Sequence, residues 1–311
     1  MIPDSAENPT SNALPPSVPA ADLVRAVASS GYPVQTVIAK SLTPDFAVVE
    51  EWGYVDRESN EHRALDIHAY RSLVKEGIQS HLHPDVVLLI ECKRSDLPFV
   101  FFEAAVPTIP RDFPSAFGFR SADFSLVVAG KGSRDTPPAE FLRLSEFPFV
   151  GKGPTICNSL TKVDKPGKIE LSGETPFRSI VMPLASARDH WAQMRSSGGQ
   201  QQTYYPSLTL TVCVLDAPMV LAAGTPESPE LQLAPWVRVV RQEAHRGHVS
   251  FRYRHYVVDF VHRAFFDTFL TQHVMPFAEA FAERLQTGHE IVLRGSGTVP
   301  DWEKWTWSDV R

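Results

Sequence analysis

The chain has 311 residues, of which 43% are apolar and 21% charged, and its formal net charge at pH 7 is −6. This composition is that of a folded globular protein and excludes a fibrous or wholly disordered chain. The negative net charge argues against a protein that packages nucleic acid through an overall positive surface. It does not exclude a nuclease, which needs a basic surface only around its site.

The N-terminus and the cysteines bear on the compartment. Residues 1–19 are polar and proline-rich, so we expect a disordered tail there rather than a secretory signal. No run of about 18 apolar residues follows, and we expect a cytoplasmic protein without a membrane partner. The cysteines are Cys92, Cys157 and Cys213, with no CxxC pair among them, so a disulfide framework is not expected.

The first predicted elements are a helix and a β-hairpin. Residues 20–30 carry apolar side chains at helical spacing, and Gly31 with Pro33 is expected to end this helix. Residues 46–55 and 63–70 are rich in β-branched and aromatic residues and are separated by a polar turn. We expect these two segments to pair as a hairpin.

The following segments predict a central strand and then a mixture of strands and helices. Residues 86–92 form a nearly continuous apolar run, which is typical of a strand buried on both faces. Residues 175–194 have helical spacing, and Pro183 predicts a kink or break within them. The same patterns predict strands at 124–129, 207–215, 236–240 and 249–261, and a long amphipathic helix at 261–285.

The order of these elements predicts an α/β fold with a mixed central sheet flanked by helices. We expect a tail at 1–19, a core at 20–195 and a C-terminal, strand-rich α/β extension at 203–311 that packs on the core. Segment 196–202, rich in glycine and glutamine, separates the last two units. Because this segment is short and its flanks are apolar, one compact body is favoured over two independent domains.

Charged side chains stand at the end of the predicted central strand. Residues i and i+2 of a strand project from the same face, so Glu91 and Lys93 point together while Cys92 points to the other face. Asp66 is likewise out of character in the apolar second strand of the hairpin. Burying such charges is costly unless they pair or bind a ligand. We therefore expect Asp66 and Glu91 to lie close together on neighbouring strands.

Two carboxylates placed in this way suit a hard divalent cation. Mg²⁺ prefers oxygen ligands in near-octahedral geometry and keeps several of its waters, so two carboxylates and one backbone carbonyl suffice. Asp66 and Glu91 are the candidate carboxylate ligands, and the backbone carbonyl of Cys92 is the candidate third ligand. Mn²⁺ is expected to substitute for Mg²⁺. The competing interpretation is a structural salt bridge at a strand end.

These residues resemble the PD-(D/E)xK nuclease superfamily, in the restriction-endonuclease-like form of Mrr-type domains. That family has a helix, a hairpin whose second strand bears an aspartate, and a strand that bears Glu-x-Lys; the resemblance covers residues 20 to about 130. It implies Asp66 and Glu91 as catalytic metal ligands, and Lys93 as the residue that orients the attacking water or helps to deprotonate it. It also implies a Mg²⁺-dependent endonuclease, with DNA favoured over RNA and a role in restriction or antiviral defence.

A literal Pro-Asp dipeptide, Pro84-Asp85, precedes Glu91 in the same strand. At ~3.3 Å per residue it lies about 20 Å from Glu91, which is too far for a shared metal. Asp66 is therefore the better aspartate, although no proline precedes it.

Four further residues are candidates for the same site. The family often adds an acidic residue from its first helix, where this chain offers Asp22, and Glu50 or Glu51 in the first hairpin strand is another candidate. A solvated strand edge explains Glu50 and Glu51 as well. His68 shares a strand face with Asp66 and is either a catalytic or a hydrogen-bonded core histidine.

A candidate nucleic-acid contact lies in the strand predicted at 249–261. Arg252 and Arg254 alternate with aromatic residues and could meet phosphates on the side of the metal pocket, although an amphipathic outer strand explains the pattern equally well. Nucleic acid is thus the expected partner, with a second copy of the chain or a partner defence protein as further candidates. The alternative function is a catalytically inactive nucleic-acid-binding or scaffold protein that retains the nuclease fold.

Overall fold

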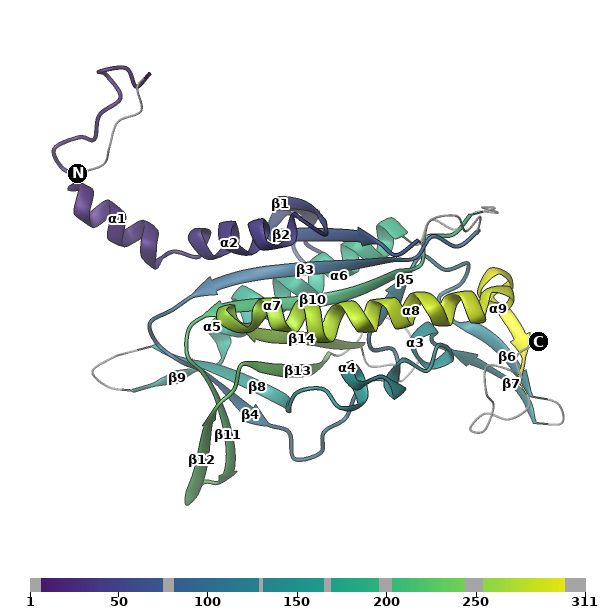
Figure 1. Ribbon diagram of the computed structural model, residues 1–311. Helices are drawn as coiled ribbons and strands as arrows, with labels where there is room; N and C mark the ends of the chain where they lie inside the picture. Colours follow the sequence, from purple (N-terminus) through teal and green to yellow (C-terminus); the bar gives the residue numbers. More distant parts are fainter. Residues whose placement is uncertain are drawn as a thin grey trace.

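The computed structural model describes residues 7–74, 81–128, 131–164, 169–195, 203–243 and 254–299 (Figure 1). These residues form a mixed α/β fold in which helices cover both faces of one large mixed sheet, as predicted. None of their helices combines the length and the apolar character that a membrane crossing requires. Residues 7–19 of the predicted tail contain no helix or strand.

Two helices precede the sheet, where the sequence predicted one. Helix α1 (Ala20–Ser29) is followed at once by α2 (Tyr32–Leu42). The first helix ends before Gly31, as predicted, whereas α2 was not predicted. Proline is accepted in the first turn of a helix because the N–H that it lacks has no partner there, so Pro33 begins α2.

The predicted hairpin and central strand are confirmed. Strand β1 (Ala47–Val55) pairs antiparallel with β2 (His62–Ser72), which pairs antiparallel with β3 (Asp85–Arg94). In β3 the residues from Asp85 to Cys92 are all buried. This continuous burial is what the nearly unbroken apolar run predicted.

The sheet continues through strands from the second half of the chain. Strand β10 (Ser207–Asp216) runs parallel to β3 along its whole length, and β14 (Arg254–His262) runs parallel to β10 on the far side. The full order is β1-β2-β3-β10-β14-β13-β8-β4-β11-β12. Its remaining strands are β13 (Trp236–Glu243), β8 (Ile156–Val163), β4 (Phe99–Glu103), β11 (Met219–Thr225) and β12 (Ser228–Leu233).

Smaller elements surround this sheet. Strand β5 (Ser115–Phe117) pairs with β10, and β9 (Leu171–Ser172) pairs with β8. A second sheet has the order β15 (Ser296–Thr298), β6 (Phe124–Val128) and β7 (Gly132–Thr136). Short helices are α3 (Pro138–Phe141), α4 (Pro148–Gly151) and α9 (His289–Arg294), with 3-10 turns at Leu144–Glu146 and Arg263–Phe265.

Two long helical segments sandwich the central strands (Figure 1). The first contains α5 (Glu174–Pro176), a π-helical turn at Phe177–Val181 and α6 (Met182–Arg195), so the irregularity predicted at Pro183 takes the form of a π turn before it. The second segment consists of α7 (Phe266–Thr268), a π-helical turn at Phe269–Val274 and α8 (Met275–Thr287).

The two faces of β3 belong to two separate cores. Leu88 and Ile90 pack in the core that also contains side chains of α2 and α8, whereas Val87 and Leu89 pack in the core of α6. Because side chains alternate along a strand, this pattern decides where the following residues point. Glu91 and Lys93 continue the α6 face, and the Cys92 side chain lies in the other core.

Candidate functional site

The three predicted catalytic side chains meet at the end of β3. Lys93 Nζ donates a hydrogen bond to Glu91 Oε2 at 2.5 Å and lies 4.0 Å from Asp66 Oδ2 on β2. Asp66 is also a hydrogen-bonding neighbour of the Glu91 side chain. The two carboxylates therefore lie close together, with one ammonium group between them.

This cluster stands where the ladder between β2 and β3 ends. Paired residues run from Ser72 opposite Asp85 to Ile67 opposite Ile90, and no pair follows at Asp66. Instead, Asp66 Oδ2 accepts a hydrogen bond of 2.6 Å from the backbone N–H of Cys92. A side-chain carboxylate thus replaces the next rung of the ladder, which opens the sheet at this point.

The opening leaves the cluster partly accessible. The Glu91 side chain is 6% exposed, whereas those of Asp66 and Lys93 are 22% and 32% exposed. A ligand that approaches the end of β3 can therefore reach the outer carboxylate and the ammonium. Glu91 forms the buried floor of the cluster.

The backbone carbonyl of Cys92, the predicted third metal ligand, lies beside this opening. A residue's N–H and C=O point to the same side of a strand, so this carbonyl faces the same side as the N–H that meets Asp66. Gly31, between α1 and α2, comes so close that a Cβ added to it would lie 2.9 Å from Cys92 O. Glycine is therefore the residue that lets the helices approach without covering the carbonyl with a side chain.

Gln35 and Glu51 complete the surroundings. Gln35 on α2 is 5% exposed, and its Nε2 donates to both Glu51 Oε1 and the backbone oxygen of Asp66, each at 3.1 Å. Glu51 has φ 51, a left-handed backbone conformation that non-glycine residues adopt at a cost of roughly 1–3 kcal/mol and that clusters at functional sites. Gln35 thus links the alternative acidic residue Glu51 to the backbone of Asp66.

Burial sets the protonation of the cluster. Burial raises the pKa of Glu91 to about 7, against the effect of Lys93 and with a further rise from the Asp66 charge. Burial alone would lower the pKa of Lys93, but the Glu91 and Asp66 carboxylates outweigh it and the pKa is raised. Near neutral pH, Glu91 therefore gains and loses its proton readily beside a charged ammonium group, which is typical of acid-base groups.

The residues present fit a hard divalent cation. Asp66 and Glu91 offer carboxylate oxygens, and the backbone carbonyl of Cys92 offers a third oxygen beside Asp66. Among the described residues, no group of three or more His, Cys, Asp or Glu side chains could hold a metal ion. An ion at this cluster would thus need the backbone oxygen or water for its remaining positions.

His68 lies on the α6 face of β2 but is a core residue. Its ring packs 4.9 Å from Trp52 and 4.8 Å from Trp191, centroid to centroid. Burial lowers the pKa of His68 to about 4, and within the described residues its Nε2 has no hydrogen-bond partner. At neutral pH it is an uncharged part of the aromatic contact that joins the hairpin to α6.

Other predicted candidates lie away from the cluster. Asp85 is fully buried at the opposite end of β3 and pairs with Arg195 at 2.5 Å, so the Pro-Asp dipeptide has a structural role. Asp22 pairs with Arg25 on the exposed helix α1. Arg252 lies outside the described residues, and only the backbone of Arg254 is described, so their predicted contact with phosphate stays a prediction.

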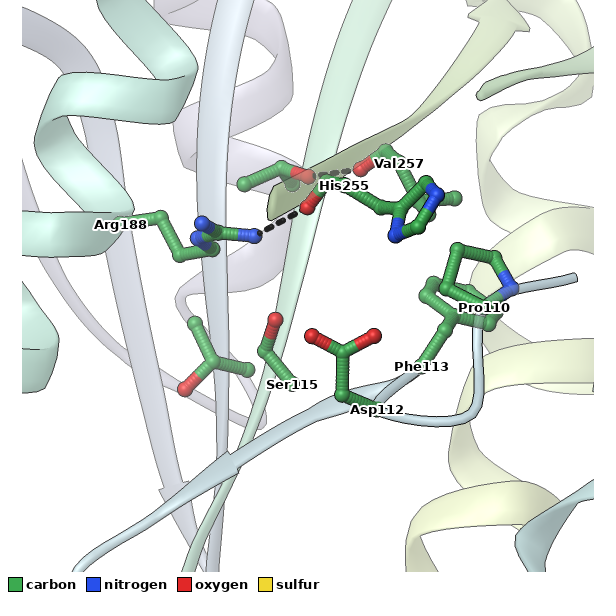
Figure 2. Close-up of a pocket in the computed structure, with 9 residues that line it drawn as sticks. Pro110, Asp112, Phe113, Ser115, Arg188, His255 and Val257 are labelled. Carbon is green, nitrogen blue, oxygen red and sulfur yellow. Dashed lines mark hydrogen bonds between the residues drawn. The ribbon is translucent and has the colours of Figure 1, made fainter. Parts of the chain in front are cut away.

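A second polar group surrounds a small cavity between β5 and β14 (Figure 2). Asp112, Ser115 and His255 project toward it, and Arg188 reaches in from α6 to donate a hydrogen bond to the His255 carbonyl at 3.0 Å. Sequence patterns do not indicate this group, because its members come from three distant segments, at 112–115, 188 and 255. The cavity volume is about 10 Å³, which is room for one water molecule and not for a substrate.

No family model, curated protein or solved structure matches the chain. The functional interpretation therefore rests on the residues of this chain and on their geometry.

Proposed function

We propose that the chain is a metal-dependent endonuclease of the PD-(D/E)xK type that hydrolyses phosphodiester bonds, with DNA as the favoured substrate. The observation that carries this proposal is the meeting of Asp66, Glu91 and Lys93 at the point where the β2–β3 ladder ends. Three charged groups are placed there at the end of a strand that is otherwise apolar and buried. A role in restriction or antiviral defence follows from the resemblance alone.

The order of elements around the cluster supports the same family. Helix α2 precedes the β1–β2 hairpin, whose second strand carries Asp66, and β3 carries Glu91 and Lys93. A long insertion then leads to α6, which covers the sheet and returns the chain to β10, parallel to β3. This order of elements supports a restriction-endonuclease-like core, in which β4 to β9 would be an insertion.

The chain's groups divide the work of phosphodiester hydrolysis. Asp66, Glu91 and the Cys92 carbonyl would hold Mg²⁺ or Mn²⁺, which when bound lowers the pKa of a bound water and stabilises negative charge on the phosphate. The raised pKa of Lys93 keeps its ammonium charged, so it supplies a positive charge and a hydrogen-bond donor beside the attacked phosphorus. The Cys92 N–H fixes the orientation of the Asp66 carboxylate.

The alternative is a structural ion pair in a scaffold or binding protein, and the 2.5 Å contact between Lys93 and Glu91 is its best support. The pair of Asp85 and Arg195 is a plain structural pair for comparison. Asp85 is 0% exposed and Arg195 18% exposed, in the closed interior beneath α6. Asp66 and Lys93 are instead more exposed and lie at an open strand end, and Gln35 links the Asp66 backbone to the left-handed Glu51. These features favour a ligand site.

Cleavage of defined nucleic acids tests the proposal. Purified protein is incubated with single-stranded and duplex DNA and RNA in Mg²⁺, in Mn²⁺ and in EDTA. We expect DNA cleavage with either ion, none in EDTA, and none by the Asp66→Asn and Glu91→Gln variants. The Asp45→Asn variant is the matched control, because Asp45 pairs with Arg71 on the surface, away from the cluster. Absence of metal-dependent cleavage on every substrate would contradict the proposal and favour the scaffold.

A further inference from the structure

A much larger cavity lies at the carboxyl ends of the parallel strands. Its volume is about 630 Å³, within the ~300–1,000 Å³ of small-molecule sites. Arg94 of β3, Asp216 of β10 and His262 of β14 stand at its rim. The carboxyl ends of parallel strands are where α/β folds commonly bind ligands.

The cavity adjoins the catalytic cluster. Arg94 follows Lys93 directly, and consecutive Cα atoms are about 3.8 Å apart. Consecutive side chains project to opposite sides of a strand, so the cluster and the cavity lie on the two sides of the end of β3. A nucleic-acid strand that passes around the end of β3 with a phosphate at Lys93 would bring a neighbouring base to Arg94.

The walls of the cavity suit a base. Residues 217–219 and 233–235 form an apolar surface, joined by the hydrogen bond from Ala234 N to Met219 O at 3.1 Å. The polar rim supplies hydrogen-bonding groups, and a guanidinium can also stack on an aromatic ring. A nucleobase has an apolar face and polar edges, which match this combination.

The charged side chains that line the rim are Arg94, Asp96 and Asp216, and Arg263 beside them adds a second positive charge that balances the rim. Asp216 lies 3.9 Å from Arg94 and 3.2 Å from Arg263. The Arg94 guanidinium also donates to the carbonyl of Ala28 in α1, which fixes it at the mouth. Such a rim does not repel a base by charge, and it offers donors and acceptors to the base edge.

We propose that this cavity holds one unpaired base of the nucleic-acid strand that is cut at the neighbouring cluster. This inference rests on the proposed nuclease function and deepens it. A base can enter the cavity only when it is not stacked in a duplex, so the preferred substrate has a single-stranded or extruded base. The apolar wall then holds the base of one nucleotide, and the cluster cuts at the phosphate of its neighbour in the same nucleic-acid strand.

The test combines removal of the bases from the nucleic-acid ligand with a substitution in the apolar wall of the cavity. A fluorescent thymidine oligonucleotide and its counterpart without bases are titrated in EDTA, so binding is measured without cleavage. Leu233 is 72% exposed and lines the cavity, whereas Leu231 is 67% exposed, two residues earlier on β12, and does not line it. Leu233→Asp and its matched control Leu231→Asp thus add the same charge to similar positions.

We expect the wild type and Leu231→Asp to bind the strand with bases about tenfold more tightly than the strand without, because one base buries its apolar face against the wall. Leu233→Asp should bring this ratio close to one, with an unchanged thermal melt. An unchanged ratio in Leu233→Asp, while the wild type still cuts DNA in Mn²⁺, overturns the base pocket and leaves the nuclease intact. If the binding ratios are as expected but no protein cuts DNA with a metal ion, the base pocket is supported and the nuclease function is overturned. If the protein neither binds nor cuts, both proposals are overturned.

Discussion

The substitution Lys93→Met separates a catalytic lysine from a structural one. Methionine keeps an unbranched apolar side chain but removes the charge that stands 2.5 Å from Glu91 and 4.0 Å from Asp66. We expect DNA cleavage to fall by two to three orders of magnitude, because loss of one preorganised charge at a transition state costs roughly 3–4 kcal/mol. Metal binding should persist, since the candidate ligands Asp66, Glu91 and Cys92 are retained.

The same substitution has a calculable effect on stability. Glu91 is only 6% exposed and loses its ion-pair partner, so the free energy of unfolding should fall by about 1–3 kcal/mol without metal. Loss of Lys93 also removes the charge that holds the pKa of Glu91 down, so this pKa rises above about 7 and protonation limits the cost. A divalent cation then replaces the lost charge, and Mn²⁺ should raise the melting temperature more in the variant than in the wild type.

Three measurements on the variant, the wild type and Arg71→Met check this reasoning. They are cleavage rate, Mn²⁺ calorimetry and melting temperature with and without Mn²⁺. Arg71 is the matched control, because it is 33% exposed and forms a surface pair with Asp45 that is worth about 0–1 kcal/mol. If Lys93→Met cuts at the wild-type rate, Lys93 has no catalytic role. If Mn²⁺ stabilises neither protein, the cluster is a structural ion pair.

Three further predictions address the ligands and their support. Because only ionised Glu91 binds a cation and its pKa is about 7, Mn²⁺ should bind about tenfold more weakly at pH 6 than at pH 8 in calorimetry. Glu91→Gln should flatten this dependence; an equally steep profile in that variant would exclude Glu91 as its source. Gly31→Ala places a Cβ 2.9 Å from Cys92 O, so the free energy of unfolding should fall by about 1–3 kcal/mol in a thermal melt and Mn²⁺ should bind more weakly. An unchanged stability and an unchanged Mn²⁺ affinity would refute the close approach. Asp85→Asn leaves Arg195 without its carboxylate partner and should lower the free energy of unfolding, measured in urea, by about 3 kcal/mol. DNA cleavage per folded molecule should stay unchanged, and a loss of cleavage without a loss of stability would show a catalytic role for Asp85.

The sequence predicted the parts of the site that depend on local patterns. The run at 86–92 and the alternation in the hairpin are visible without tertiary context, and they place Asp66, Glu91 and Lys93 on neighbouring strands. Two charged residues at the end of an apolar strand then indicate a site. The end of the β2–β3 ladder was not predictable, because it depends on the Asp66 side chain replacing a backbone partner.

The missed features depend on contacts between distant segments. Pro33 was interpreted as a terminator, so α2 and the contact from Gln35 to Glu51 were not expected. Strand β12 is exposed at every position and contains Pro229, and a proline within a short run argues against a strand in the sequence. The base pocket likewise needs β11, which the sequence did not predict, to return beside β4.

Strand β10 explains why the two halves of the chain belong to one site. It begins beyond segment 196–202, yet it pairs with β3 from Ser207 opposite Asp85 to Asp216 opposite Arg94. Its carboxyl end therefore lies level with that of β3, and the chain continues from it directly into the apolar wall of the cavity at 217–219. The N-terminal half supplies the charged cluster and the C-terminal half supplies the wall that would receive the base. In the proposed function, catalysis and substrate selection are thus joined through the β3–β10 ladder, and a substitution that shifts its register would disturb both together.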